Sequence, residues 1–107
     1  MVKGRINCGI CGHTVEVNAI PEGRRKVKLD IKSSCGNYQK IAEELKEAEP
    51  FKELFQPLGQ GEMFQLLAKN IPHPSCPGIA GILKTIEVAA GLALPQTAVI
   101  EVEKSEE

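Results

Sequence analysis

Aromatic residues are scarce in this chain. Tryptophan is absent, and Tyr38 is joined only by Phe51, Phe55 and Phe64. A protein that stacks successive nucleic-acid bases needs several aromatic side chains for the purpose. The formal net charge is −1, so no overall positive field attracts a polyanion either. The composition therefore argues against nucleic acid as a partner.

Long hydrophobic runs are also missing. The most apolar stretch, residues 78–94, is interrupted by Lys84 and Glu87 and is shorter than the roughly 20 residues that cross a bilayer. The first residues alternate in polarity, whereas a signal peptide has an apolar core of about 7–15 residues. We therefore expect a cytoplasmic protein without membrane contact, in which cysteines stay reduced.

The chain is long enough to fold without covalent staples. Its 107 residues suffice for a single domain, residues 1–107, with its own hydrophobic core. The hydrophobic fraction of 42% and the charged fraction of 25% are those of an ordinary globular protein. The cysteines are therefore available for a role other than stapling the fold.

Four segments alternate between apolar and polar residues, which predicts β-strands. They are residues 2–8, 13–20, 25–33 and 97–103. In the third segment, Val27, Leu29 and Ile31 alternate with charged residues and give the clearest pattern. Because short connections join the first three strands, we expect an antiparallel meander, completed by the C-terminal strand.

Helical spacing replaces this alternation in the middle of the chain. Tyr38, Ile41, Ala42 and Leu45 follow the i, i+3, i+4, i+7 rule and predict a helix that ends near Ala48. Further helices are expected over residues 51–58, 62–70 and 79–90. The predicted fold class is α+β, a mostly antiparallel sheet with helices packed on one face. The covered face should carry Val15, Val17, Val27, Leu29 and Ile31.

The cysteines are the most informative residues of the sequence. Each is followed directly by Gly or Pro, and each falls where two expected elements meet: Cys8, Cys11, Cys35 and Cys76. The first and third strands of a meander run in the same direction, so Cys8 and Cys35 should lie at the same end of the sheet. We therefore predict that the four sulfurs converge at that end.

The segment Cys8-Gly9-Ile10-Cys11-Gly12 separates two thiols by two residues, a spacing that lets both bind one metal ion. It resembles the cysteine knuckles of rubredoxins and zinc ribbons. The resemblance covers residues 8–12 alone, since the second knuckle of those families is absent, and it implies the knuckle geometry but not the ribbon fold. As a whole, the chain is similar to small uncharacterised cysteine-containing proteins of methanogenic archaea, which implies no activity.

The leading hypothesis is a small metal-binding protein whose ligands are the four cysteines. Four thiolates suit a structural Zn²⁺ ion or an iron–sulfur cluster, and the sequence does not choose between them. A site with four protein ligands is closed, which favours a structural or electron-transfer role over hydrolysis. His13 or His73 could replace a missing cysteine. No catalytic residue is assigned, and enzymatic activity stays open.

Two alternatives remain. The first is a thiol–disulfide redox protein that uses Cys8 and Cys11, although such pairs usually open a helix and this pair lies between two strands. The second is a non-catalytic module that docks a protein partner. Its candidate surface is the basic run Arg24-Arg25-Lys26-Val27-Lys28, which a solvated hairpin face or a phosphate contact would also explain.

Overall fold

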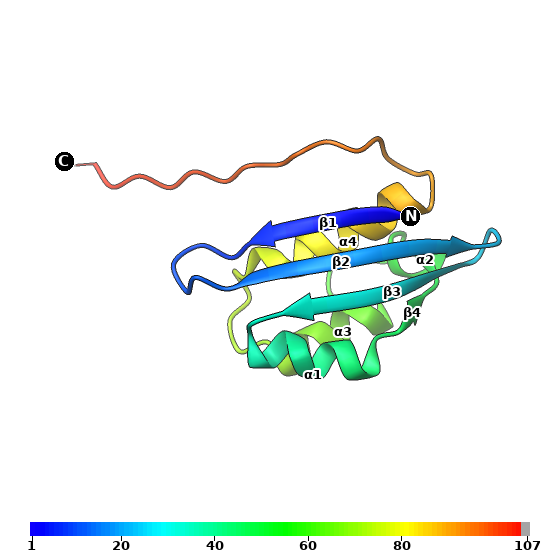
Figure 1. The fold of residues 1–107 in the computed structure, drawn as a ribbon, viewed down its shortest axis with the longest axis horizontal. Coiled ribbons are helices and arrows are strands. Elements are labelled where there is room, and N and C mark those ends of the chain that lie inside the picture. The colour runs from blue at the N-terminus through cyan, green and yellow to red at the C-terminus, as the bar shows by residue number, and fades with distance from the viewer. Residues whose placement is uncertain (106–107) are drawn as a thin grey trace.

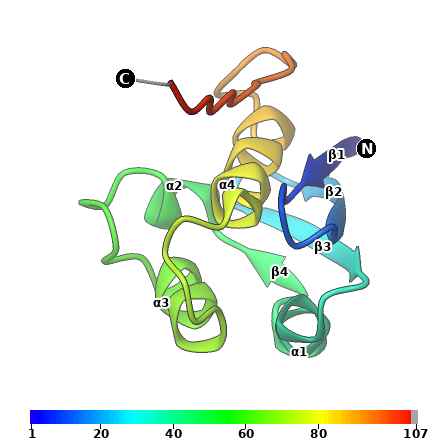
Figure 2. The same cartoon turned by 90° about the vertical axis from the view of Figure 1, so that its left-hand side faces the viewer.

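A computed structural model describes residues 1–105. The chain forms a four-stranded sheet with helices packed on one face, so the predicted α+β class is confirmed (Figure 1). The strands are β1 (Val2–Asn7), β2 (Thr14–Glu22), β3 (Lys26–Ser33) and β4 (Glu47–Ala48). The helices are α1 (Gly36–Glu44), α2 (Pro50–Glu53), α3 (Glu62–Asn70) and α4 (Pro77–Ala89). Figure 2 looks at the end of the sheet and shows the β1–β3 meander on one side and α2, α3 and α4 on the other.

The first three strands form the predicted antiparallel meander. Val17 in the middle of β2 lies opposite Gly4 of β1 and Ile31 of β3. Alternate residues of β2 and β3 are buried beneath the helices, as their alternating polarity predicts. The buried positions include Val15, Val17, Val27, Leu29 and Ile31.

The fourth strand is not the predicted one. It is the two-residue β4, where Ala48 pairs with Val27, so the predicted first helix ends at Glu44 and not near Ala48. The expected strand over residues 97–103 was wrong, because residues 94–105 form neither helix nor strand and leave the body as an extended segment (Figure 1). Alternating polarity suits a strand, but a strand exists only where another strand supplies its hydrogen bonds.

Helix α4 packs very closely on β1. A side chain at Gly4 would collide with Thr85 of α4, and a side chain at Gly81 would collide with Ile6 of β1. Glycine at both positions therefore lets strand and helix backbones approach one another. Since Gly81 lies by Ile6 and Thr85 by Gly4, α4 runs antiparallel to β1. Its first turn is thereby placed at the end of the sheet where β1 finishes.

Candidate functional site

All four cysteines lie at one end of the sheet, on the left in Figure 1. Cys8 follows β1, and Cys11 lies in the turn that leads to β2. Cys35 connects β3 to α1, and Cys76 immediately precedes α4. All four are free thiols; Cys76 is buried, Cys8 and Cys35 are half-buried, and Cys11 is exposed. Segments distant in the sequence thus bring their cysteines to the same edge.

The turn that carries Cys8 and Cys11 depends on two glycines. Gly9 and Gly12 have φ values of 89° and 76°, a left-handed conformation that other residues adopt only at a cost. The Gly12 N–H donates to the Gly9 carbonyl at 2.9 Å, and the Cys8 N–H donates to the His13 carbonyl at 3.0 Å. This explains locally why glycine follows each cysteine of the pair.

Hydrogen bonds tie this turn to the start of α1. The His13 Nδ1 atom lies 2.8 Å from the Ser34 hydroxyl, next to Cys35. The Ser33 hydroxyl donates to the Thr14 carbonyl at 2.7 Å and accepts from the Cys35 N–H at 3.0 Å. His13 therefore joins the two cysteine-bearing segments as a hydrogen-bonding residue. The second candidate histidine, His73, is exposed in the loop before Cys76.

The structure brings Cys8 and Cys76 into direct interaction. Burial raises the pKa of the Cys8 thiol to about 12, and repulsion by the Cys76 thiolate and a hydrogen bond with Cys76 are the next causes. Weaker repulsion comes from Cys11 and then from Cys35. All three other cysteines thus lie within electrostatic reach of Cys8.

Tyr38 also lies at the end of the sheet that carries the cysteines. The sequence pattern assigned it only to the apolar face of the first predicted helix. Its hydroxyl lies 2.9 Å from the Cys76 sulfur, and both groups are buried. Burial raises the pKa of Tyr38, followed by the hydrogen bond with Cys76 and the negative charge there. One feature of the sequence could have indicated that Tyr38 lies near the cysteines. It follows Cys35 by three residues, about one turn into the helix that begins after this cysteine.

Two helix N-termini adjoin the cysteine cluster. Cys35 is the N-cap of the nine-residue α1, and Cys76 is the N-cap of the thirteen-residue α4. Neither side chain caps its helix with a hydrogen bond, so both sulfurs are available for other partners. The free amides and the helix dipole favour negative charge at these positions.

The four sulfurs do not surround a common point. Across residues 1–105, no three or more His, Cys, Asp or Glu side chains are arranged so that they could hold a metal ion. Cys8 and Cys76 interact directly, whereas Cys11 remains exposed at the tip of its turn. The fold therefore gathers the cysteines at one end without arranging them as ligands.

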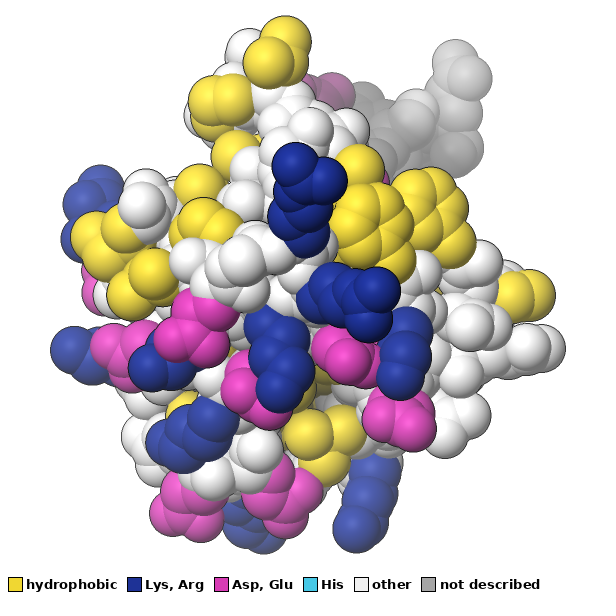
Figure 3. Space-filling view, turned by 90° about the vertical axis from the view of Figure 1, so that its right-hand side faces the viewer, with side chains coloured by type: hydrophobic (Ala, Val, Ile, Leu, Met, Phe, Trp, Pro, Cys, Tyr) yellow, Lys and Arg dark blue, Asp and Glu magenta, His cyan; other side chains and the backbone are white. Residues whose placement is uncertain are grey.

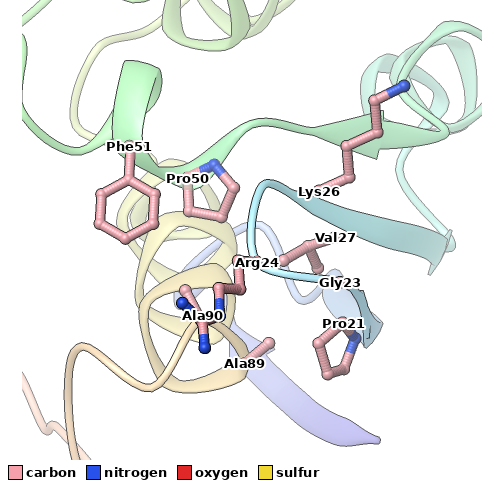
Figure 4. A pocket seen from close by; sticks show the side chains of 9 residues that line it. All are labelled: Pro21, Gly23, Arg24, Lys26, Val27, Pro50, Phe51, Ala89 and Ala90. Carbon is pink, nitrogen blue, oxygen red and sulfur yellow. The ribbon is translucent and has the colours of Figure 1, made fainter.

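The basic run of the β2–β3 hairpin lies at the opposite end of the sheet. Figure 3 views that end and shows Lys and Arg side chains interspersed with Asp and Glu. Lys28 lies 3.0 Å from Glu22, and Lys26 lies 3.7 Å from Glu47. A hollow of about 230 Å³ lies beside the hairpin, and Arg24 extends across it toward Ala90 at the end of α4 (Figure 4). A cation is favourable at a helix C-terminus, which supplies a structural reason for Arg24.

The fold and the cysteine end define a small α+β protein with a cluster of free thiols. The chain belongs to DUF6951, a family of unknown function, whose model matches residues 2–102. Comparison with curated proteins and with solved structures finds no match. The matched range contains all four cysteines and most of the extended C-terminal segment.

No helix within residues 1–105 has both the length and the apolar character that a membrane crossing requires.

Proposed function

We propose that this protein binds one soft metal centre, a zinc ion or an iron–sulfur cluster, through the thiolates of the four cysteines. The observation that carries the proposal is the meeting of three chain segments at one end of the sheet, each of which brings cysteine (Figure 1). The turn between β1 and β2 has the two-residue spacing and the glycines of a metal-binding knuckle. Cys76, from the far side of the sequence, reaches Cys8 of that turn.

The electrostatics of the cluster support a cation as its occupant. Burial is the main cause of the raised pKa of Cys8, and repulsion from each of the other three thiolates raises it further. A bound metal ion reverses this balance, because a coordinating thiol is deprotonated outright. The helix N-termini at Cys35 and Cys76 lower the cost of the remaining negative charge.

Metal binding requires a local rearrangement. Zinc–sulfur bonds are about 2.3 Å long, so the Cys11 and Cys35 side chains must turn toward the Cys8–Cys76 contact. Cys11 is free to do so, since it is exposed in a hairpin turn. The closed site would then join the hairpin to the first turns of α1 and α4. Its expected role is structural or electron-transferring, because four protein ligands leave no position for a substrate.

Metal analysis and a visible spectrum of protein purified without oxygen test this proposal. We expect about one zinc per chain with no visible colour, or iron and sulfide with the absorbance of a cluster. Replacing each cysteine singly by serine should lower the metal content, whereas Ser75→Ala, beside Cys76, should not. Colourless protein with far less than one metal per chain, after supplementation with zinc and with iron and sulfide, would overturn the proposal.

The contact between Cys8 and Cys76 also favours a revised redox hypothesis, in which these two thiols form a disulfide in place of Cys8 and Cys11. The raised pKa of Cys8 argues against it as the attacking group, because the thiolate is the nucleophile. Mass mapping of the metal-free protein after treatment with a disulfide oxidant distinguishes the readings. If the reduced protein binds no metal and the oxidised protein contains a Cys8–Cys76 disulfide, the redox hypothesis is favoured.

A further inference from the structure

The outer edge of β1 is an unpaired sheet edge. The strand order is β1-β2-β3-β4, so β1 hydrogen-bonds to β2 on one side and to no other strand within residues 1–105. Edge strands present open N–H and C=O groups that can pair with a further strand. The side chains of Val2 and Ile6 are only partly buried at this edge. β1 is therefore able to accept another strand on its free side.

The C-terminal segment has the sequence of a strand but no partner. Helix α4 ends at Ala89, and Gly91, which follows the C-cap residue Ala90, has a φ of 76°; the N–H of Leu92 donates to the Glu87 carbonyl at 3.0 Å. The segment beyond is rich in β-branched residues, with Val99, Ile100 and Val102 exposed by 74%, 78% and 90%. The family match extends to residue 102, so the segment belongs to the family's shared sequence.

The segment and the β1 edge are complementary in charge. Lys3 and Arg5 are exposed on the face of β1 that points away from the helices. On the extended segment, Glu101 and Glu103 occupy one parity of the alternation, and Ile100 belongs to the other. A pairing that turns Ile100 toward the helix side sets the two glutamates beside the two basic residues, whichever way the strand runs. Opposite charges on neighbouring strands stabilise the pair.

The topology disfavours pairing of this segment with β1 of its own chain. Because α4 runs antiparallel to β1, the segment starts near the beginning of β1 and would have to run parallel to it. Helices α2, α3 and α4 lie behind the strands of Figure 1, as Figure 2 shows, and the free edge of β1 is its upper one. Parallel strand pairs are slightly less stable per residue than antiparallel pairs.

We propose that the β1 edge receives residues 97–103 of a second copy of this chain, so that two copies exchange their C-terminal segments. A segment from a second copy can approach the edge in either direction, so it can form the more stable antiparallel pair with β1. Direct pairing of two β1 edges is disfavoured, because it would place Lys3 and Arg5 of one copy against those of the other. The exchange buries apolar side chains that are exposed in the single chain. It is independent of metal binding.

Sedimentation equilibrium of the full chain, with and without added chelator, tests the exchange. We expect a dimer, and a monomer for a variant that stops after Gln96. Hydrogen exchange should show protection of the amides of residues 98–103 in the dimer and its loss on dilution. A full chain that stays monomeric at millimolar concentration, with this segment protected or not, would overturn the proposal. A dimer that survives the truncation would do the same.

Charge reversal gives a sharper test that keeps the chain length. Lys3→Glu with Arg5→Glu should raise the dimer dissociation constant at least about tenfold at low salt, and Glu101→Lys with Glu103→Lys should do likewise. Combining both pairs should restore dimerisation. The matched controls are Lys40→Glu with Lys69→Glu and Glu43→Lys with Glu44→Lys, all at exposed helical positions. Failure of the combined variant to recover would contradict the proposed pairing.

Discussion

The Tyr38 hydroxyl lies 2.9 Å from the Cys76 sulfur, and this contact links α1 to the start of α4 inside the protein. Tyr38 is 1% exposed and Cys76 is 8% exposed, so water does not compete freely for either group. The Cys76 sulfur also interacts with Cys8 at the end of β1. Cys76 is therefore the point where two helices and the hairpin of the cysteine end meet.

Removing the tyrosine hydroxyl should weaken this junction. We expect Tyr38→Phe to lower the free energy of unfolding by about 0.5–1.5 kcal/mol, because the ring is kept and one buried hydrogen bond is lost. Urea unfolding of reduced, metal-free protein measures the change. Ser34→Ala, which removes an exposed hydroxyl beside His13, serves as the control and should cost less. Equal stability of Tyr38→Phe and the wild type would show that the contact contributes nothing.

The first turns of the two cysteine-capped helices should respond oppositely to alanine. A Cβ at Gly78 would collide with the Tyr38 ring and hydroxyl, whereas a Cβ at Gly36 meets no atom within 4 Å. Gly78→Ala should cost about 1–3 kcal/mol of unfolding free energy through overpacking. Gly36→Ala should be neutral or stabilising by up to about 1 kcal/mol. Thermal and urea unfolding test the pair, and a harmless Gly78→Ala would mean that α4 can shift away from Tyr38.

The metal-free protein should lose stability as the solution becomes alkaline. The pKa of Cys8 rises from its ordinary 9.0 to about 12 on folding, so folding favours the protonated thiol. This contribution is complete below about pH 9 and is lost as the pH rises toward 12, because only the unfolded chain releases the proton in that range. Tyr38, whose pKa is also raised, acts in the same direction.

Urea unfolding between pH 8 and pH 11 in reductant and chelator measures this dependence, because pH 8 lies below the ordinary Cys8 pKa of 9.0 and pH 11 lies between that value and the raised pKa of about 12. Cys8→Ser should flatten the decline, whereas Cys11→Ser at the exposed position should leave most of it. An unchanged slope in Cys8→Ser would contradict the assignment of the proton to this thiol.

The core beneath the sheet should tolerate no large truncation. Ile82 of α4 is fully buried, so Ile82→Ala should cost about 2–5 kcal/mol of unfolding free energy. Leu58→Ala removes a similar number of atoms from an exposed side chain and should change stability by less than about 0.5 kcal/mol. Chemical denaturation of both variants provides the comparison. Similar costs at the two positions would mean that α4 is not packed as the structure places it.

Local patterns in the sequence predicted much of the fold. The alternation of β3 matches its burial, and α3 has the predicted range of residues 62–70. The glycines after Cys8 and Cys11 predicted a tight turn, which Gly9 and Gly12 form with positive φ. Each of these features depends on residues that are neighbours along the chain, so the sequence pattern contains the information.

The strand prediction for residues 97–103 failed for a different reason. Ala98, Ile100 and Val102 occupy every second position, as the apolar residues of a true strand do. Glu47 and Ala48 form a strand without any such pattern, because they lie beside Lys28 and Val27 of β3. Strand formation depends on a hydrogen-bonding neighbour, and that neighbour is supplied by the path of the whole chain.

By itself, the sequence determined the hairpin meander, the apolar face of the sheet and the placement of each cysteine at a junction between elements. These follow from side-chain periodicity and from the backbone freedom of glycine, both of which act over a few residues. Only the tertiary structure decided that Cys76 meets Cys8 and Tyr38, since the close packing of α4 on Gly4 sets where that helix begins. A contact between distant residues depends on how closely whole elements can pack, and no local pattern records that distance.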